Sequence, residues 1–282
     1  MAGLHRHIFL ENDCFAKLVD GGGTHRCVVF VHGWGGSPAT TWFRFQELVD
    51  DGSDPSALAW WQETDLYFYS YESRRFSIAE HAEGLLQFLD GVYPTRPASV
   101  IMGEQLEEQQ YTELILVGHS LGAVVLREGV LDRAALKLAP QRPQDQSPAI
   151  LDAHLRLFAP AMHGAKPSGF LGLAYHLLRE IREIKPWFQA ARESQVIVRQ
   201  LQSESDKLKS LRTDTEKFAA ETSFRALVAH VVYGENEHIV ERDKFRLDKI
   251  ALPIAGQDHR SVCKPDVDYT EPLRFVREGA HA

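Results

Sequence analysis

Short apolar runs rich in β-branched residues alternate along this chain with segments of helical periodicity. The runs at 27–31 and 114–117 are almost wholly apolar, which is typical of strands buried on both faces of a sheet. Further strands are predicted at 16–19, 66–71, 154–159, 226–233 and 249–254, and helices at 78–90, 121–135 and 270–277. Strands that alternate with helices predict an α/β fold whose mostly parallel sheet is flanked by helices. Residues 21–24 (Gly-Gly-Gly-Thr) predict a hairpin turn that joins the strands at 16–19 and 27–31.

The alternation stops between residues 159 and 226, where no strand is predicted. A helical pattern at 170–184 is followed by Leu201, Leu208, Leu211 and Phe218 in heptad-like spacing. We interpret residues 165–222 as a helical cap inserted in a single domain that spans 1–282. The alternative is a short intermolecular coiled coil, which the two polar positions in the apolar seam disfavour.

Composition excludes several classes of protein and site. Hydrophobic residues make up 44% of the 282 residues, which is ordinary for a globular chain. A net charge of −8 argues against a general binder of nucleic acid. Three scattered cysteines give neither a disulfide scaffold nor metal-ligand spacing, so we expect no metal and no cofactor. Without a signal-peptide pattern or a long apolar stretch, the expected location is the cytoplasm.

Residues 118–122 read Gly-His-Ser-Leu-Gly, a Gly-x-Ser-x-Gly pattern that by itself arises easily by chance. Its context is specific, because it follows the predicted strand at 114–117 and opens the predicted helix at 121–135. A nucleophile elbow requires this strand, turn and helix, and it exposes the serine hydroxyl on a strained turn. We therefore predict that Ser120 is a nucleophile.

A glycine-rich segment, His-Gly-Trp-Gly-Gly at 32–36, directly follows the strand at 27–31. Backbone amides in such a turn can face a cavity and, with the amide that follows the nucleophile, stabilise an oxyanion. The candidates for this oxyanion hole are the amides of Trp34 and Leu121.

A serine nucleophile needs a histidine as base and an acid to orient it, and in this type of fold the order is serine, acid, histidine. His259 follows the predicted strand at 249–254 and is the candidate base; its neighbour Asp258 is a poor partner for the same imidazole. Two glutamates compete for the role of acid in the turn after the strand at 226–233. Glu237 has the hydrolase register Gly-x-x-acid-x-x-Val, and we favour it, whereas Glu235 lies nearer the strand end.

Four segments together resemble a known family. They are 30–36 (Phe-Val-His-Gly-Trp-Gly-Gly), 69–73 (Tyr-Ser-Tyr-Glu-Ser), 116–122 (Leu-Val-Gly-His-Ser-Leu-Gly) and 259–265 (His-Arg-Ser-Val-Cys-Lys-Pro). The chain resembles α/β-hydrolases, and more narrowly the lipase-like serine hydrolases related to the serine-active-site-containing protein of mitochondria and to GPI-inositol deacylases. The resemblance implies an α/β-hydrolase fold with a Ser-His-acid triad, and some relatives carry the acid at the place of Glu235.

The expected function is hydrolysis of a carboxylic ester through an acyl-enzyme on Ser120. Apolar residues at 170–178 favour a small-molecule or lipid ester with an apolar acyl group, and they allow peripheral membrane contact through the cap. Cleavage of an amide or thioester by the same triad is an alternative. A hydrolase fold used only for binding is another, since fold does not prove function.

Overall fold

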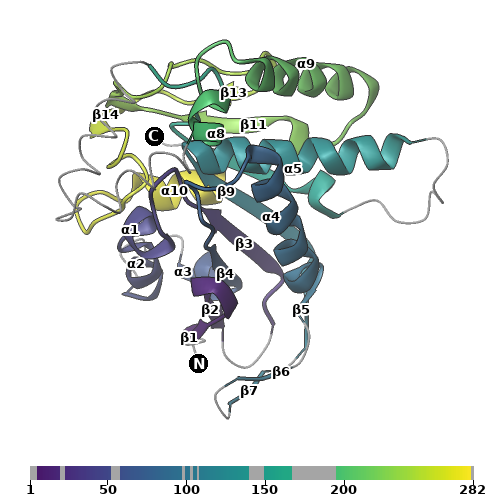
Figure 1. Ribbon diagram of the computed structural model, residues 1–282. Coiled ribbons are helices and arrows are strands. Elements are labelled where there is room, and N and C mark those ends of the chain that lie inside the picture. Colours follow the sequence, from purple (N-terminus) through teal and green to yellow (C-terminus); the bar gives the residue numbers. More distant parts are fainter. Residues whose placement is uncertain are drawn as a thin grey trace, which may run out of the picture.

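An eight-stranded sheet forms the centre of the computed structural model, which describes residues 5–19, 23–51, 58–96, 99–101, 104–106, 108–139, 149–166 and 195–280 (Figure 1). The strands run in the order β1 (His5–Phe9), β2 (Phe15–Val19), β4 (Thr64–Tyr69), β3 (Arg26–Val31), β9 (Glu113–His119), β10 (His154–Phe158), β11 (Ala229–Val232) and β13 (Lys249–Ile250). From β4 to β13 all neighbours are parallel, whereas β1 and β2 are antiparallel. The predicted mostly parallel sheet is confirmed.

Helices cover both faces of this sheet (Figure 1). One face carries α4 (Ile78–Val92) and α5 (Leu121–Leu138), which pack side by side. The other face carries α1 (Pro38–Trp42), α2 (Phe45–Asp51), α3 (Leu58–Gln62) and α10 (Glu271–Glu278). The helices predicted at 78–90, 121–135 and 270–277 correspond to α4, α5 and α10. α4 and α5 begin at the predicted residue and extend further, whereas α10 is shifted by one residue. Ser77 begins α4 through a capping box with Glu80, which satisfies backbone amides in the first turn.

The predicted hairpin between 16–19 and 27–31 is wrong. In the sheet, β4 lies between β2 and β3, and β2 pairs instead with β1 and β4. A glycine-rich sequence indicates a turn, but it does not indicate which strand pairs with β2. The strand β1 was not predicted, because its sequence His-Arg-His-Ile-Phe is mostly polar and lies at the sheet edge.

The two C-terminal strands are shorter than predicted. The run at 226–233 begins as a 3-10 turn (Arg225–Leu227), and the strand itself starts at Ala229, whose amide donates to Asp248 Oδ1. The run at 249–254 divides into β13 and β14 (Ile254–Asp258), because Pro253 between them cannot donate a ladder hydrogen bond. β14 pairs with β12 (Gly234–Asn236) in a separate small sheet.

Two further pairs of short strands precede β9. They are β5 (Thr95–Arg96) with β8 (Gln109–Gln110), and β6 (Ser99–Ile101) with β7 (Glu104–Leu106). Both pairs are antiparallel and lie outside the central sheet.

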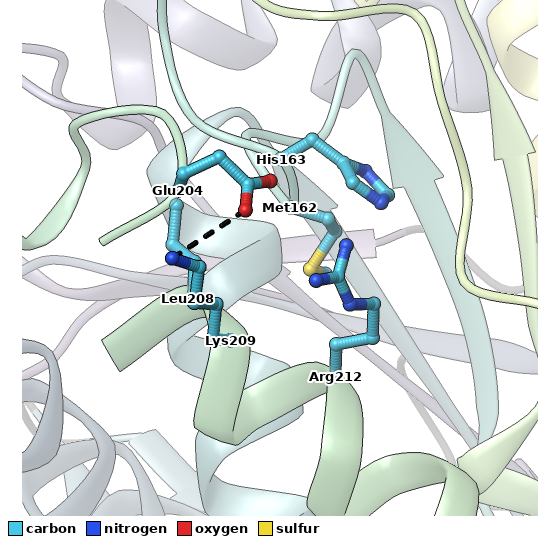
Figure 2. A pocket seen from close by; sticks show the side chains of 6 residues that line it. All are labelled: Met162, His163, Glu204, Leu208, Lys209 and Arg212. Atoms are coloured by element: carbon cyan, nitrogen blue, oxygen red, sulfur yellow. Dashed lines mark ion pairs between the residues drawn. The ribbon is translucent and has the colours of Figure 1, made fainter. Parts of the chain in front are cut away.

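The predicted cap falls only partly within the described residues, because residues 167–194, including the apolar run at 170–178, lie outside them. The described part holds α8 (Gln195–Gln200) and α9 (Asp206–Glu221). α9 packs beside α5 with Leu208 and Leu211 buried, so its apolar seam is covered by this chain itself. A small surface cavity lies between α9 and the loop after β10, and an ion pair of Glu204 and Lys209 lies at its rim (Figure 2).

Aromatic rings form a continuous layer on one face of the sheet. Phe15, Phe68 and Phe30 lie on neighbouring strands and stack with centroid distances of 4.5 and 4.8 Å. Phe30 also meets Trp42 of α1 edge to face at 5.0 Å. Each ring buries a large apolar area, so this layer stabilises the strands that carry the candidate site.

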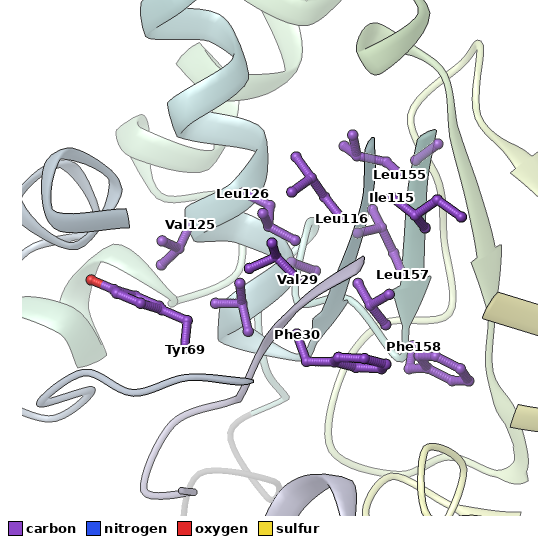
Figure 3. Packing of buried hydrophobic residues seen from close by; sticks show 14 of the residues in the cluster. Val29, Phe30, Tyr69, Ile115, Leu116, Val125, Leu126, Leu155, Leu157 and Phe158 are labelled. Atoms are coloured by element: carbon purple, nitrogen blue, oxygen red, sulfur yellow. The ribbon is translucent and has the colours of Figure 1, made fainter. Parts of the chain in front are cut away.

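Aliphatic side chains fill the opposite face. Figure 3 shows Val29 of β3 and Leu116 of β9 beside Leu126 of α5, all of them fully buried. Successive residues of a strand point to opposite faces, so Val29 contacts this helix layer while Phe30 contacts the aromatic layer. The run at 27–31 is apolar throughout because both of its faces are covered.

Candidate active site

Ser120 lies at the sharp turn between β9 and α5. Its backbone has φ 54° and ψ −116°, a conformation that non-glycine residues rarely adopt and that is costly unless the surroundings impose it. A Cβ at Gly118 would lie 2.7 Å from the Ala123 Cα, and a Cβ at Gly122 would lie 2.3 Å from the Val31 carbonyl oxygen. Only glycine fits at these two positions, so the pattern Gly-x-Ser-x-Gly is required by the close approach of α5 to β9 and β3.

The segment after β3 packs directly against this turn. Val31 pairs with Gly118 in the parallel ladder, so the chain beyond each of them emerges at the same edge of the sheet. A Cβ at Gly33 would lie 3.0 Å from Ser120 Cβ. The glycine therefore allows the backbone of the 32–36 segment to approach the serine.

Side chains that follow β4 hold this segment in place. The Tyr71 hydroxyl donates to the carbonyl oxygen of His32 at 2.7 Å, and the ring of Tyr71 stacks on the imidazole of His32 at 4.4 Å. The amide of Gly35 donates to Ser73 Oγ at 2.8 Å. Burial lowers the pKa of His32 to about 4, so its ring is neutral and packs as part of the core.

The small sheet of β12 and β14 brings the candidate acid and base together. Asn236 pairs with Asp258, and each immediately precedes a candidate residue, Glu237 or His259. A Cβ at Gly234 would lie 2.3 Å from a carbonyl oxygen of β14, so the two strands approach closely where this pairing begins. This pairing therefore brings together Glu237 and His259, which are 22 residues apart in sequence.

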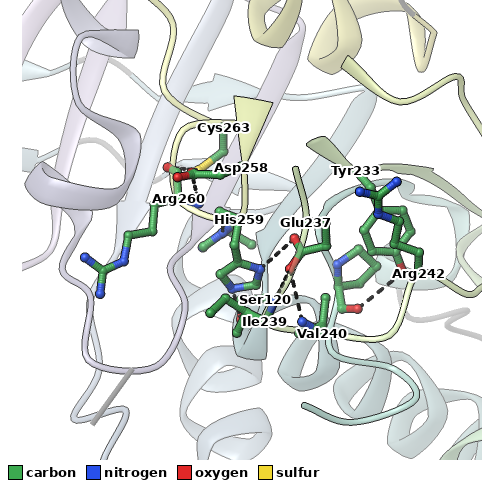
Figure 4. Close-up of polar contacts among 12 residues, drawn as sticks. Ser120, Tyr233, Glu237, Ile239, Val240, Arg242, Asp258, His259, Arg260 and Cys263 are labelled. Atoms are coloured by element: carbon green, nitrogen blue, oxygen red, sulfur yellow. Dashed lines mark hydrogen bonds and ion pairs between the residues drawn. The ribbon is translucent and has the colours of Figure 1, made fainter. Parts of the chain in front are cut away.

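The side chains of Ser120, His259 and Glu237 form one hydrogen-bonded chain (Figure 4). Ser120 Oγ lies 3.0 Å from His259 Nε2, and Glu237 Oε2 lies 2.9 Å from His259 Nδ1. An ionised carboxylate can only accept, so Nδ1 donates to Glu237 and Nε2 is left to accept the hydroxyl proton of Ser120. His259 and Glu237 are buried, whereas Ser120 is partly exposed.

The environment of Glu237 keeps this carboxylate charged. Burial acts to raise its pKa, but the hydrogen bond and charge of His259 and the amides of Val240 and Ile239 outweigh burial, so the pKa is lowered. Those amides donate to Oε1 at 3.0 and 2.7 Å. Glu237 therefore carries the negative charge that fixes the tautomer of His259.

The structure separates the two competing glutamates. Glu235 is exposed, and its carboxylate accepts from the amide of Gly256 on the neighbouring strand at 3.0 Å. Within the described residues its carboxylate has no contact with His259, so the two glutamates are not equivalent. Glu237 alone of the pair reaches the imidazole.

Asp258 also points away from the imidazole of its neighbour, as expected. Its carboxylate accepts from the amides of Arg260 and Ser261, both at 2.8 Å, and closes the turn that carries His259. Burial acts to raise the pKa of Asp258, but these hydrogen bonds lower it.

The two residues predicted for an oxyanion hole adjoin Ser120. Leu121 is the first residue of α5, where a backbone amide has no acceptor within its own helix. Trp34 is half-buried and follows Gly33, the residue in contact with Ser120. Both amides thus belong to backbone at the carboxyl edge of the sheet.

Several residues contact the candidate site although the sequence did not predict them there. Tyr71 and Ser73 hold the 32–36 segment, the amides of Ile239 and Val240 bind Glu237, and His119 contacts the backbone of His259. His119 and His259 lie 140 residues apart, and no local sequence pattern links them. For residues 69–73 the sequence offers a predicted strand that ends at 71 and a resemblance to the family, and neither signal points to these contacts.

Among the described residues, no group of three or more His, Cys, Asp or Glu side chains could hold a metal ion. Across the same part of the chain, every helix is too short or too polar to cross a bilayer.

Comparison with known protein families identifies the fold of this chain. A model of the alpha/beta hydrolase family matches residues 28–268, which include Ser120, Glu237 and His259. The chain belongs to the alpha/beta hydrolase family. Most of this hydrolase is covered by the match, and the mostly parallel sheet with helices on both faces is the fold of the family.

Solved structures similar to this alpha/beta hydrolase share little sequence with it. Phospholipase PlaB from Legionella pneumophila is 16% identical over 75% of this chain, with a TM-score of 0.42; the match spans 38% of the PlaB chain, well under half its length. Carboxylesterase CesB from Bacillus subtilis is 12% identical over 99% of this chain and 93% of its own, with a TM-score of 0.49. A monoacylglycerol lipase from Paleococcus ferrophilus is 15% identical over 98% and 96%, with a TM-score of 0.43. A search of curated protein sequences finds no match.

Proposed function

We propose that this alpha/beta hydrolase is a serine esterase of the lipase-like group, which cleaves carboxylic esters through a covalent acyl-enzyme. The observation that carries the proposal is the hydrogen-bonded chain of Ser120, His259 and Glu237 at a strained elbow. A serine hydroxyl is a weak nucleophile unless a base accepts its proton, and here His259 Nε2 is available for that purpose.

In the first half of the reaction, Ser120 Oγ attacks the ester carbonyl carbon and its proton passes to His259 Nε2. The charge of Glu237 stabilises the imidazolium that forms. The amides of Trp34 and Leu121 donate to the oxyanion of the tetrahedral intermediate. When this intermediate collapses, the alcohol leaves with the proton from His259, and the acyl group stays on Ser120.

In the second half, a water molecule takes the place of the alcohol. His259 removes a proton from this water as it attacks the acyl carbon, and a second tetrahedral intermediate forms. Its collapse releases the carboxylic acid and returns the proton to Ser120. The same two amides donate to the oxyanion of both intermediates.

Replacement of the nucleophile tests the proposal. We expect Ser120→Ala to reduce kcat on a soluble p-nitrophenyl ester by at least about 10³-fold with the fold intact, because the covalent route is lost. A fluorophosphonate should label the wild type and not the variant. Ser210→Ala removes an exposed serine of α9 and is the matched control. An active Ser120→Ala protein would overturn the triad, and an inactive, unlabelled wild type would favour a binding module.

An apolar acyl group is the proposed substrate preference, and it rests on the apolar sequence at 170–178. Initial rates over esters of increasing acyl length, with a matched thioester and a peptide, measure this preference directly. A maximum at medium or long chains supports an apolar pocket. Faster cleavage of the thioester or peptide would replace the ester proposal. Binding to phosphatidylcholine vesicles tests membrane contact separately.

A further inference from the structure

His119 precedes the proposed nucleophile and also touches the proposed base. Its side chain is buried, and its Nε2 lies 2.7 Å from the backbone carbonyl oxygen of His259, which is 140 residues later in the chain. One residue therefore joins the backbone of the elbow to the backbone that carries the imidazole. The mechanism proposed above assigns no task to this contact.

The tautomer of His119 follows from its partner. A carbonyl oxygen can only accept, so the proton of His119 is on Nε2. Burial, and then the charge of His259, lower the pKa of His119 to about 3, so the ring is a neutral donor near neutral pH. Neutrality matters here because the two rings have centroids 5.0 Å apart, and a cation at His119 would disfavour the imidazolium of His259.

The other side of the His119 ring contacts the 32–36 segment. A Cβ at Gly33 would lie 3.0 Å from Nδ1 of His119, and the same Cβ would lie 3.0 Å from Ser120 Cβ. The ring is thus in contact with the segment that carries the Trp34 amide as well as with the loop of His259. It lies where the nucleophile, the base and the oxyanion segment meet.

The second ring nitrogen of His119 has a cost for the folded protein. Nδ1 is buried and has no hydrogen-bond partner within the described residues, which costs free energy that an apolar ring would avoid. An apolar residue at this position would avoid that cost but could not donate to His259. The hydrogen bond of Nε2 is thus what histidine supplies here and an apolar ring does not.

We propose that His119 is a positioning residue: its Nε2–H holds the backbone of His259 so that the imidazole stays within hydrogen-bond distance of Ser120 Oγ. The inference rests on the proposed triad. A displacement of about 1 Å between reacting groups can cost about 10²-fold in rate. Loss of this one hydrogen bond should therefore lower kcat rather than substrate binding.

Two substitutions at position 119 separate donation from packing. His119→Phe keeps a ring but removes the donor, and we expect kcat on a soluble ester to fall about 10- to 100-fold with KM changed less than about 2-fold. His119→Gln restores a neutral N–H at a similar reach, and we expect it to recover kcat to within about 5-fold of the wild type. Active-site titration with a fluorophosphonate normalises each rate to the competent protein present.

His230→Phe is the matched control. His230 also bonds a backbone carbonyl through its ring, that of Gly279 at 2.7 Å, but it lies on β11 at the C-terminal helix, away from Ser120. The substitution His230→Phe should lower the unfolding temperature of the protein without a change in kcat per titrated site. If His119→Phe behaves in the same way, the role of His119 is structural and the proposal is wrong.

A measurement on the wild type keeps the proposal testable if both variants fail to fold. Nitrogen NMR of labelled histidines should find the His119 proton on Nε2 from about pH 5 to about pH 9. A proton on Nδ1, or a ring that titrates in this range, would overturn the proposal. Failure of the esterase proposal is distinct, since it would appear as a wild type that no fluorophosphonate labels.

Discussion

Glu237 Oε2 lies 2.9 Å from Nδ1 of His259. This contact depends on the pairing of β12 with β14, in which Asn236 lies opposite Asp258, because these two residues directly precede Glu237 and His259. Glu235, two residues earlier, is exposed and bonds the backbone of the opposite strand instead. Strand β12 and the residue that follows it therefore carry one carboxylate that bonds the imidazole and one that bonds the backbone of β14.

This difference predicts unequal effects of two matched substitutions. Under the proposed mechanism, Glu237→Gln should lower kcat by about 10³- to 10⁴-fold, because the imidazole loses the partner that selects its tautomer. Glu235→Gln should change kcat by less than about 3-fold, because its carboxylate bonds the amide of Gly256 and not His259. Both are assayed on one soluble ester. A collapse at 235 with a mild effect at 237 would reverse the assignment, and two mild effects would place the acid elsewhere.

The elbow predicts a strong dependence on glycine. Gly122→Ala would place a Cβ 2.3 Å from the carbonyl oxygen of Val31, so we expect a loss of about 3 kcal/mol or more of unfolding free energy. Gly91 also lies in a helix, α4, but a Cβ there meets nothing within 4 Å. Gly91→Ala should stabilise the protein by up to about 1 kcal/mol, because alanine favours the helix. Urea unfolding of the two variants compares them, and equal stabilities would contradict the close approach of α5 to β3.

A buried ion pair on α5 should be sensitive to the loss of one partner. Arg127 Nη2 lies 2.8 and 2.9 Å from the two carboxylate oxygens of Asp248, and both side chains are fully buried. Asp248→Asn leaves a buried guanidinium without its counter-charge, so we expect a loss of about 3–5 kcal/mol in unfolding free energy.

The control for this pair lies on the same helix. Arg133 pairs with Asp90 at the surface, and the carboxylate of Asp90 is largely exposed. Asp90→Asn should therefore cost at most about 1 kcal/mol. If Asp248→Asn costs no more than Asp90→Asn in urea unfolding, the Arg127 pair is not needed to hold α5 on the sheet.

Six histidines with lowered pKa values predict how stability changes with pH. Burial is the largest cause of a lowered pKa in six histidines, to about 3 for His119 and about 4 for His32 and His81; the others are His7, His154 and His230. An unfolded histidine titrates near 6.5, so below that pH the unfolded chain binds more protons than the folded chain. The free energy of unfolding should therefore fall as the pH is lowered from about 7 to about 5.

Urea unfolding at a series of pH values measures this slope. His81→Phe removes one of the groups that the folded chain holds neutral, so it should make the slope shallower. His81 belongs to neither the triad nor the oxyanion segment. If the free energy of unfolding stays constant or rises as the pH falls through this range, the folded protein does not keep these histidines neutral and the prediction is wrong.

Local features of the sequence were sufficient for much of the fold. The apolar runs of β3 and β9 and the periodicity of α4 and α5 predicted an α/β sheet, because burial on both faces requires continuous apolar strands. The elbow at Ser120 was equally readable, since strand, turn and helix are contiguous and the two glycines are demanded by steric contact. The alpha/beta hydrolase family follows from the same segments.

Contacts between distant segments were decided by the tertiary structure alone. The sequence left Glu235 and Glu237 as competitors, because side chains two residues apart differ only through the register of β12 on β14 and the course of the chain beyond it. The sequence likewise could not predict the strand that pairs with β2 or the contact of His119 with His259. Local propensity carries no information about which distant segment supplies the hydrogen-bond partner. Residue types and spacing thus determined which candidate catalytic groups the chain holds, and packing decided which of these groups meet.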